Sequence, residues 1–414
     1  MIRLDADQAA QWLAEQLRGT AGRVFIPCGA AEPLALFDAL AAEPALAAGL
    51  TFVGAYLPGA NRRDWAGLHD KASAEGTFVS NDWRASFEAG RFAFRPLTYF
   101  QTFGWLASTP LDAAVFHVSP PDQDGRCSLG VATDLSPAVA GRAVLKVALV
   151  NPRMPRTVGP SAPFDAFDVV VEGDWPLAEY DAGTLDPAFD RISQTIAGLT
   201  PEGASVQFGI GKAGVAALAA LEGRRGLKIH SGMVTDPLLS VLDAGSVDEV
   251  VTGLALGTRP LFERCASDRR IRFEAASYTH DIRTLAAIPR LVAVNSALDV
   301  DLFGQANAEF IAGRQVSGIG GLTDFLRGAR LSEGGVPIVA LNATAKGRSR
   351  IVPRLAPNAV SVPRADMGVV VTEHGHADLR GLDLDARAQA LTAIAAPEHR
   401  DALANAWDEM RRGM

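Results

Sequence analysis

The residues with the clearest capacity for chemistry lie in the stretch LKIHSGMVTDP, residues 227–237. Apolar and polar residues alternate along its first positions, as in a short strand, and Pro237 then opens a run typical of a helix. The end of a strand just before a helix is where open α/β proteins place reactive groups. His230 and Ser231 stand at this point, but the next residue is Gly232, which has no side chain to react.

A glycine-rich segment, FGIGKAG at residues 208–214, gives a second chemical signal. Gly209 and Gly211 begin a G-x-G-x-x-G pattern between a predicted strand and a predicted helix. A dinucleotide site of this kind needs an acidic residue at the end of the next strand, and LKIHSG has none. The glycines therefore indicate either a tight turn or amide groups that bind the phosphates of another ligand.

A second glycine cluster, SGIGGLTDF at residues 317–325, also precedes a predicted helix. The amide groups near Gly318, Gly320 and Gly321 are expected to face an anion or a carbonyl oxygen. Two such clusters in one part of the chain favour a ligand that carries both phosphates and a carbonyl group.

The elements that must position these residues alternate between strands and helices. Short runs rich in β-branched residues, such as DAAVFHVS, KVALVNP and RLVAVNS, are separated by alanine-rich helical stretches such as EPLALFDALAAEPALAAG. This alternation predicts an α/β fold with largely parallel sheets. A change of pattern near residues 174–204 divides the chain, and we predict two similar open α/β domains, residues 1–185 and residues 186–414.

Composition excludes several classes of protein. The chain has 414 residues, of which 48% are hydrophobic and 21% charged, as in compact globular proteins. The net charge of −8 argues against nucleic acid as a partner, and no apolar run is long enough to cross a membrane. Three dispersed cysteines and an N-terminus without the pattern of a signal peptide lead us to expect a cytoplasmic protein.

Seven ordered motifs resemble the acetyl-CoA hydrolase and 4-hydroxybutyrate-type CoA-transferase family. They are HVSPPDQDGRCSLGVATD (117–134), VNPRMPRTVG (150–159), FGIGKAG, LKIHSGM, NSALDVDLFGQANAE (295–309), SGIGGLTDFLRGA (317–329) and VVTEHGHADLRG (370–381). The resemblance implies two α/β domains of the CoA-transferase type with an acyl-CoA thioester bound between them. It implies no cofactor except the coenzyme A of the substrate, and a homodimer is the candidate assembly.

The resemblance also implies a mechanism from which this chain departs. In that family a glutamate of a His-Ser/Thr-Glu-Met motif attacks the thioester, and the resulting anhydride passes CoA to a second carboxylic acid. Here the motif reads His230-Ser231-Gly232-Met233, so the position of the nucleophile is vacant. The family's oxyanion-stabilising asparagine corresponds to His280 in SYTHD, whereas the backbone amide in the second glycine cluster is retained as Gly321.

These two changes predict a different reaction at the same site. A histidine with a pKa near 6.5 accepts a proton at neutral pH, and the absent glutamate is expected to leave room for water or a small acceptor beside Gly232. We therefore expect thioester hydrolysis or direct acyl transfer to water, a hydroxyl or an amine, with His280 as general base. Two alternatives stay open: a CoA-transferase that uses another carboxylate, and a CoA-binding protein without turnover, in which His280 is a bystander.

The remaining polar residues of the motifs have structural interpretations. Glu309 and Glu373 are expected to be architectural, and Asp301 to be a buried, hydrogen-bonded strand residue. His374 and His376 have no third ligand at a telling spacing, so we predict no metal site. Ser231 is expected to contact the substrate rather than to act as a nucleophile, because no G-x-S-x-G elbow surrounds it.

Overall fold

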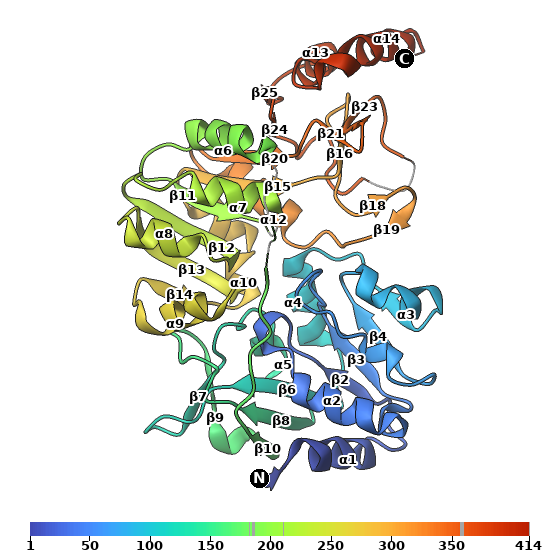
Figure 1. Ribbon diagram of the computed structural model, residues 1–414, viewed down its shortest axis with the longest axis vertical. Helices are drawn as coiled ribbons and strands as arrows, with labels where there is room; N and C mark the ends of the chain where they lie inside the picture. Colours follow the sequence, from blue (N-terminus) through green and yellow to red (C-terminus); the bar gives the residue numbers. More distant parts are fainter. Residues whose placement is uncertain (182, 184–186, 210, 357–359, 414) are drawn as a thin grey trace. The chain divides into compact units, whose positions relative to one another are not determined.

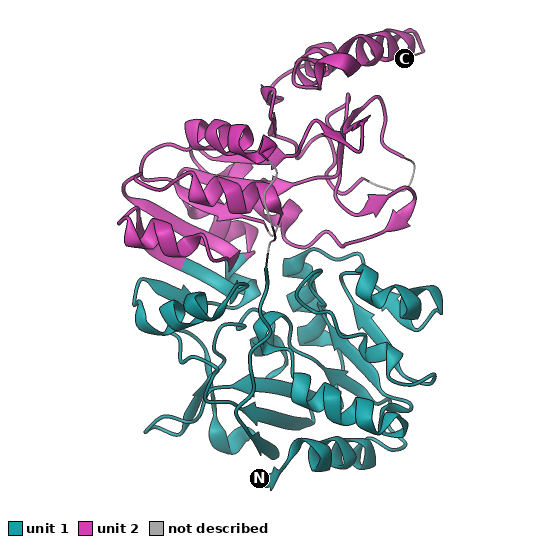
Figure 2. Ribbon diagram, in the orientation of Figure 1, with its two compact units in different colours: residues 1–181, 251–279 teal, residues 182–250, 280–414 magenta. Residues whose placement is uncertain are grey.

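The computed structural model describes residues 1–181, 183, 187–209, 211–356 and 360–413. The chain divides into two compact units (Figure 2), unit 1 with residues 1–181 and 251–279, and unit 2 with residues 182–250 and 280–414. The domain boundary predicted at residue 185 stays a prediction, and the contacts group residues 251–279 with unit 1. The prediction of an α/β fold with largely parallel sheets is confirmed.

Unit 1 is built on an 8-stranded sheet (Figure 1), whose neighbouring strands all pair in parallel. In spatial order its strands are β1 (Ile2–Leu4), β10 (Val169–Glu172), β8 (Leu145–Val150), β6 (Ala113–Val118), β2 (Arg23–Phe25), β3 (Thr51–Gly54), β4 (Ser73–Gly76) and β5 (Phe92–Phe94). Strand β6 is buried along its whole length, as expected for the centre of a parallel sheet. A separate antiparallel pair joins β7 (Arg126–Ser128) and β9 (Ser161–Pro163).

Unit 2 contains six complete strands of the second 8-stranded sheet. In spatial order they are β12 (Leu227–Val234), β11 (Ser205–Phe208), β15 (Leu291–Ser296), β20 (Val336–Ala340), β24 (Val369–Thr372) and β25 (Gly375–Asp378). Only the β24–β25 pair among these is antiparallel. Strand β13 (Val247–Ala255) begins in unit 2 and ends in unit 1, which also holds β14 (Ile271–Phe273). Short strands complete the unit: β16 (Asp299–Asp301), β17 (Ala306–Asn307), β18 (Phe310–Ile311), β19 (Arg314–Gln315), β21 (Thr344–Ala345), β22 (Arg348–Ser349) and β23 (Ile351–Val352).

Helices connect the strands in both units. Unit 1 has α1 (Ala6–Gln16), α2 (Leu34–Ala42), α3 (Arg84–Glu88), α4 (Tyr99–Ser108), α5 (Ser136–Val139), α9 (Arg259–Ser267) and α10 (Ala276–Thr279). Unit 2 has α6 (Ala188–Leu199), α7 (Lys212–Ala219), α8 (Leu238–Asp243), α11 (Ile282–Ala287), α12 (Leu322–Leu331), α13 (Leu384–Ala393) and α14 (Arg400–Arg412). Helices α7 and α12 both pack on the central strand β15 of unit 2 (Figure 1).

Two local predictions need correction. The alanine-rich stretch at residues 32–49 is not one helix, because α2 ends at Ala42 and Pro44 begins a separate 3-10 turn. Proline has no N–H for the helical ladder and clashes with the preceding turn, so the helix stops before it. The strand LKIHSG does not end at Gly232, since β12 continues to Val234.

Neither a membrane-spanning helix nor a metal-binding cluster occurs in the part of the chain that the structure describes. No described helix combines the length and the apolar character that crossing a bilayer requires. Among the same residues, no group of three or more histidine, cysteine or acidic side chains is placed to hold a metal ion. The three cysteines are buried free thiols.

Candidate functional site

Gly232 lies in β12, two residues before the end of that strand. The preceding Ser231 is fully buried, and its hydroxyl donates to the carbonyl oxygen of Phe208 at 3.1 Å and accepts from the Phe208 amide at 3.4 Å. The Ser231 side chain therefore links β12 to β11 through hydrogen bonds. Its role in substrate contact stays a prediction. His230 is also buried.

His280 stands between two short helices. It follows α10 directly and precedes Asp281, which caps α11 by accepting from the Arg283 amide at 2.9 Å. The Asp281 carboxylate also forms an ion pair with the Arg283 guanidinium at 2.7 Å. Asp281 thus directs its carboxylate toward Arg283.

The structure brings Gly232, His280 and Gly321 together in unit 2. A Cβ atom built on Gly232 would lie 2.5 Å from Cε1 and 2.6 Å from Nε2 of His280. A Cβ atom built on Gly321 would lie 2.7 Å from both Cδ2 and Nε2 of the same ring. The imidazole therefore rests on both glycines, and its Nε2 atom is the nitrogen that faces them.

The gap expected above Gly232 is not open space in this structure. Of the three atoms nearest to a Cβ at that position, two belong to His280 and the third is Cε2 of Phe325 at 3.6 Å. No carboxylate oxygen is among them. The expectation of room for a water molecule or an acceptor is wrong for this arrangement, because the histidine ring fills the place that a side chain at position 232 would take.

Burial changes the proton affinity of the imidazole. His280 is 4% exposed, and desolvation, with a smaller effect of the nearby His230, lowers its pKa from 6.5 to about 3. Taking a charged imidazolium out of water is unfavourable, so the neutral ring is preferred. The expectation of a pKa near 6.5 is therefore wrong, and His280 is neutral throughout the physiological pH range.

Phe325 is a site residue that the sequence did not single out. Its ring packs on the imidazole with centroids 4.7 Å apart and planes tilted by 56°. It lies on α12, one turn after Gly321, and it is 2% exposed. Helical spacing i, i+4 places Gly321 and Phe325 on one face, which is the signal in the segment GGLTDF that could have indicated the contact.

The glycines of FGIGKAG are explained by close packing. A Cβ at Gly211 would collide with Ser296 of β15, one at Gly209 would lie a tight 3.2 Å from Oδ1 of Asn295, and one at Gly214 would lie 2.6 Å from the Gly209 carbonyl oxygen. This packing supports the tight-turn interpretation over the phosphate-binding one. Substrate contact by Gly209 and Gly211 stays a prediction, and residue 210 between them lies outside the described residues.

The second glycine cluster precedes α12. Gly318 and Gly320 are buried, Gly320 has a φ of +56°, and Gly321 is the N-cap residue of the helix. Because a positive φ is strained for residues with a side chain, Gly320 allows the chain to turn into α12. The binding roles predicted for Gly318 and Gly320 are not decided by this geometry.

The motif carboxylates are held by hydrogen bonds. Glu309 accepts from Ser361 at 2.6 Å and from Gln315 at 3.3 Å, and Glu373 accepts from the Ala343 amide at 2.7 Å. Asp301 is 1% exposed, and its carboxylate accepts from backbone amides that include Phe303 and Gln305. These contacts agree with the architectural interpretation of all three residues.

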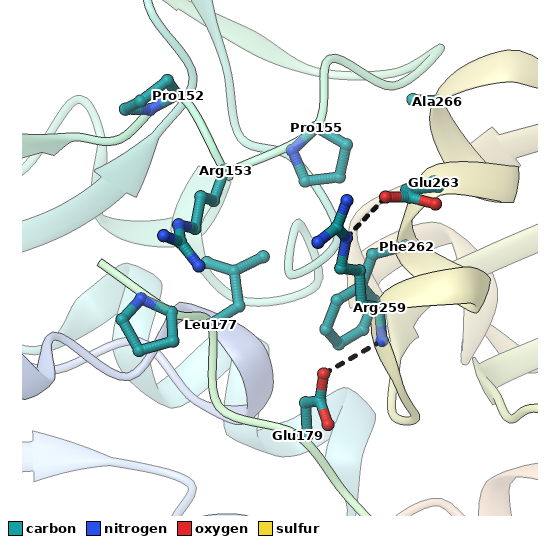
Figure 3. A pocket seen from close by; sticks show the side chains of 10 residues that line it. Pro152, Arg153, Pro155, Leu177, Glu179, Arg259, Phe262, Glu263 and Ala266 are labelled. Carbon is teal, nitrogen blue, oxygen red and sulfur yellow. Dashed lines mark hydrogen bonds and ion pairs between the residues drawn. The ribbon is translucent and has the colours of Figure 1, made fainter. Parts of the chain in front are cut away.

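A cavity of about 830 Å³ lies in unit 1 (Figure 3), and its lining includes Pro152, Arg153 and Pro155 of the motif VNPRMPRTVG. Its walls combine prolines, Leu177 and Phe262 with two arginines. Arg259 bonds through Nε to Glu263 at 2.6 Å, and its amide donates to Glu179 at 3.1 Å. Arg153 pairs with Asp174. Both arginines thus already form ion pairs with acidic side chains. The lining of this cavity therefore does not indicate a reaction.

Comparisons with known proteins agree with the motifs. Residues 14–173 match the acetyl-CoA hydrolase/transferase N-terminal domain, and residues 257–407 match the C-terminal domain of the same family. The chain is 33% identical over 398 residues to the 4-hydroxybutyrate coenzyme A transferase of Clostridium kluyveri, which covers 92% of this chain and 93% of that protein. It is 30% identical over 275 residues to the acetyl-CoA hydrolase of Eremothecium gossypii, covering 63% of this chain and 49% of that protein.

Solved structures give the same result. RipA from Yersinia pestis superimposes with a TM-score of 0.89 at 29% identity, over 99% of this chain and 100% of the other. The 4-hydroxybutyrate CoA-transferase of Porphyromonas gingivalis superimposes with a TM-score of 0.80 at 30% identity, over 100% of this chain and 98% of the other. The chain therefore belongs to the acetyl-CoA hydrolase/transferase family.

Proposed function

We propose that the protein cleaves acyl-CoA thioesters at the site of Gly232, His280 and Gly321, by hydrolysis or by direct acyl transfer to a small acceptor. Coenzyme A enters only as part of the substrate, and no glutamyl anhydride forms at position 232. The observation that carries this proposal is the position of the imidazole, whose Nε2 atom lies over the two glycines, where the family would have a carboxylate.

His280 acts in its neutral form. One nitrogen of a neutral imidazole accepts a proton and the other donates one. The oxygen of water or of an acceptor attacks the thioester carbonyl carbon, and its proton passes to His280. The tetrahedral intermediate then expels the CoA thiolate, which takes the proton back from the imidazolium. This cycle needs His280 to move aside enough for the attacking oxygen to approach Gly232.

The rate enhancement expected from these groups is modest. A general base typically contributes about 10²–10⁴-fold, and the low pKa of His280 favours the lower end of that range because a weak base removes a proton less readily. An oxyanion donor such as the Gly321 amide adds about 10²–10³-fold. Together these effects support a slow thioesterase or acyltransferase without covalent catalysis.

A thiol-release assay across short and long acyl-CoAs tests the proposal. We expect release of CoA without any added carboxylic acid, and an increase when small alcohols or amines compete with water. A strict requirement for a carboxylate acceptor would instead assign the protein as a CoA-transferase. Tight binding with no release would assign it as a CoA-binding protein.

The names of the relatives favour the transferase as the second candidate, since the protein of Clostridium kluyveri that matches 92% of this chain is a CoA transferase. That mechanism requires a carboxylate other than one at position 232. Glu309 would first have to leave its hydrogen bonds to Ser361 and Gln315.

A further inference from the structure

We propose that Gly232 and Gly321 form a two-glycine seat for the His280 imidazole, and that Phe325 is the positioning residue that holds the ring on this seat. The inference rests on the proposed function, which it deepens. Gly232 is then more than a lost nucleophile, because its missing side chain is what admits the histidine.

Space, and not backbone conformation, requires glycine at both positions. Gly321 has a φ of −85°, and Gly232 lies in a regular strand, so neither residue uses the left-handed region that favours glycine. A Cβ at either position would stand 2.6 to 2.7 Å from Nε2 of His280, well inside van der Waals contact. The imidazole and the two glycines are therefore sterically complementary.

Phe325 forms the third wall of the seat. Its Cε2 atom lies 3.6 Å from the Cβ point of Gly232 and 3.0 Å from that of Gly321, while its ring packs on the imidazole. Phe325 itself belongs to a buried apolar cluster with Leu285, Leu291, Ala293 and Ala329. Close packing of this kind defines the resting position of the imidazole, from which the ring must move when an attacking oxygen approaches.

The two helices that carry these groups are held close together. Gly328 of α12 packs against Leu285 of α11 so closely that any side chain at position 328 would overlap it. His280 lies two residues before α11, and Phe325 lies one turn before Gly328. The α11–α12 contact therefore sets the distance between the imidazole and the ring that supports it.

The seat predicts that positions 232 and 280 are coupled. Any side chain at position 232 must displace the imidazole, whereas a shorter residue at position 280 makes room for it. His230 on β12 lowers the pKa of His280, and the Asp281–Arg283 ion pair lies next to His280 in the chain.

Gly232→Ala is the direct test, because the atoms its methyl group would strike belong to a side chain that can rotate and not to the backbone. We expect a folded protein whose His280 resonance, identified among the seven histidines by comparison with His280→Asn, is shifted. Turnover should fall roughly 10²-fold, the usual effect of misplacing a reacting group by about 1 Å, with KM nearly unchanged. In the His280→Asn background the same methyl group should have no further effect on turnover.

Phe325→Leu tests the positioning role, and Phe303→Leu is its matched control, since Phe303 is a buried ring of unit 2 that packs on Trp407 instead. We expect Phe325→Leu to shift the His280 resonance, to raise the pKa of His280 toward 6.5 and to lower kcat, whereas Phe303→Leu changes none of the three. An unchanged His280 resonance in both Gly232→Ala and Phe325→Leu would overturn the seat. Wild-type protein without turnover would overturn the proposed function alone, because the resonance measurements do not depend on activity.

Discussion

His280 combines two properties that a surface histidine does not have. It is buried, and it lies against two glycines and the ring of Phe325. Burial favours the neutral form, and that form can bond to a carbonyl oxygen or to an attacking hydroxyl. The family resemblance implies an asparagine amide at this position, which cannot take up a proton, whereas an imidazole can.

The first prediction concerns turnover. His280→Ala should lower kcat for thioester cleavage by about 10²-fold, the lower end of the range for a general base, and leave the affinity for CoA nearly unchanged. His280→Asn separates the two roles of the imidazole, since an amide still donates a hydrogen bond but accepts no proton. Full activity in His280→Asn would show that the ring serves only as a donor, and full activity in both variants would make it a bystander.

The second prediction concerns pH and stability. Because the folded pKa of His280, about 3, lies below its ordinary value of 6.5, the unfolded chain binds the proton more readily between these two values. The stability that this histidine contributes is therefore complete above pH 6.5 and is lost as the pH falls toward 3. The difference in unfolding free energy between wild type and His280→Asn should fall by about 1.4 kcal/mol per pH unit in that window. Urea titrations at several pH values measure it, and a flat difference would contradict the assigned burial.

The residue types of the site could be predicted from the sequence, but their environment could not. The motif HSGM and the histidine of SYTHD were sufficient to select Gly232 and His280. Burial and the nearby His230 lower the pKa of His280, and the Phe325 ring packs on it. His230 and Phe325 are far from His280 in the chain and reach it only through the fold. The sequence was therefore sufficient to select Gly232 and His280, but the filling of the space above Gly232 by the His280 ring could not be predicted from it.

Close packing between a strand end and the following helix shapes unit 2 at the scale of elements. Gly214 in the first turn of α7 lies against the backbone of Gly209, just after β11. A glycine in a helix normally reduces stability, so its presence here requires a packing reason, and the close approach of the Gly209 carbonyl provides one.

A third prediction follows for this contact. Gly214→Ala should destabilise the fold by about 1–3 kcal/mol, because the new methyl group meets backbone that cannot rotate away. Gly198→Ala in α6 is the control, since a methyl group there meets no atom within 4 Å, and it should stabilise by about 0.5–1 kcal/mol. Chemical denaturation of both variants measures the difference, and equal effects would argue against the packing role.

Elements with strong patterns were predictable, and short ones were not. Strands β6, β8 and β15 coincide with apolar runs that the sequence shows clearly. Strand β4 reads SAEG, and it is a strand only because β3 and β5 pair with it on either side. Tertiary pairing overrides a weak local preference of this kind.

At the scale of the whole molecule, the chain passes between the units more than once. It enters unit 2 after residue 181, returns to unit 1 within β13 and enters unit 2 again at His280. No change of composition marks the crossings near residues 250 and 280. For this reason only one domain boundary could be predicted from the sequence. All the residues proposed for the chemistry belong to unit 2.

A fourth prediction separates binding from chemistry in the intact protein. CoA should raise the melting temperature of wild type and of His280→Ala by the same amount, because a ligand that binds the folded state stabilises it whether or not a reaction follows. Thermal scans over a CoA concentration series provide the measurement. A shift that is present in wild type and lost in His280→Ala would assign the imidazole to binding instead of catalysis.

The central claim is that thioester cleavage proceeds without a covalent bond to a protein carboxylate. Mass spectrometry of the full-length protein during turnover, after treatment with hydroxylamine or borohydride, tests this claim most directly. The predicted result is continued release of CoA with no change in the mass of any peptide. A hydroxamate or a reduced carboxylate at Glu309, or at any other acidic residue, would contradict the mechanism and assign the protein as a transferase with a relocated nucleophile.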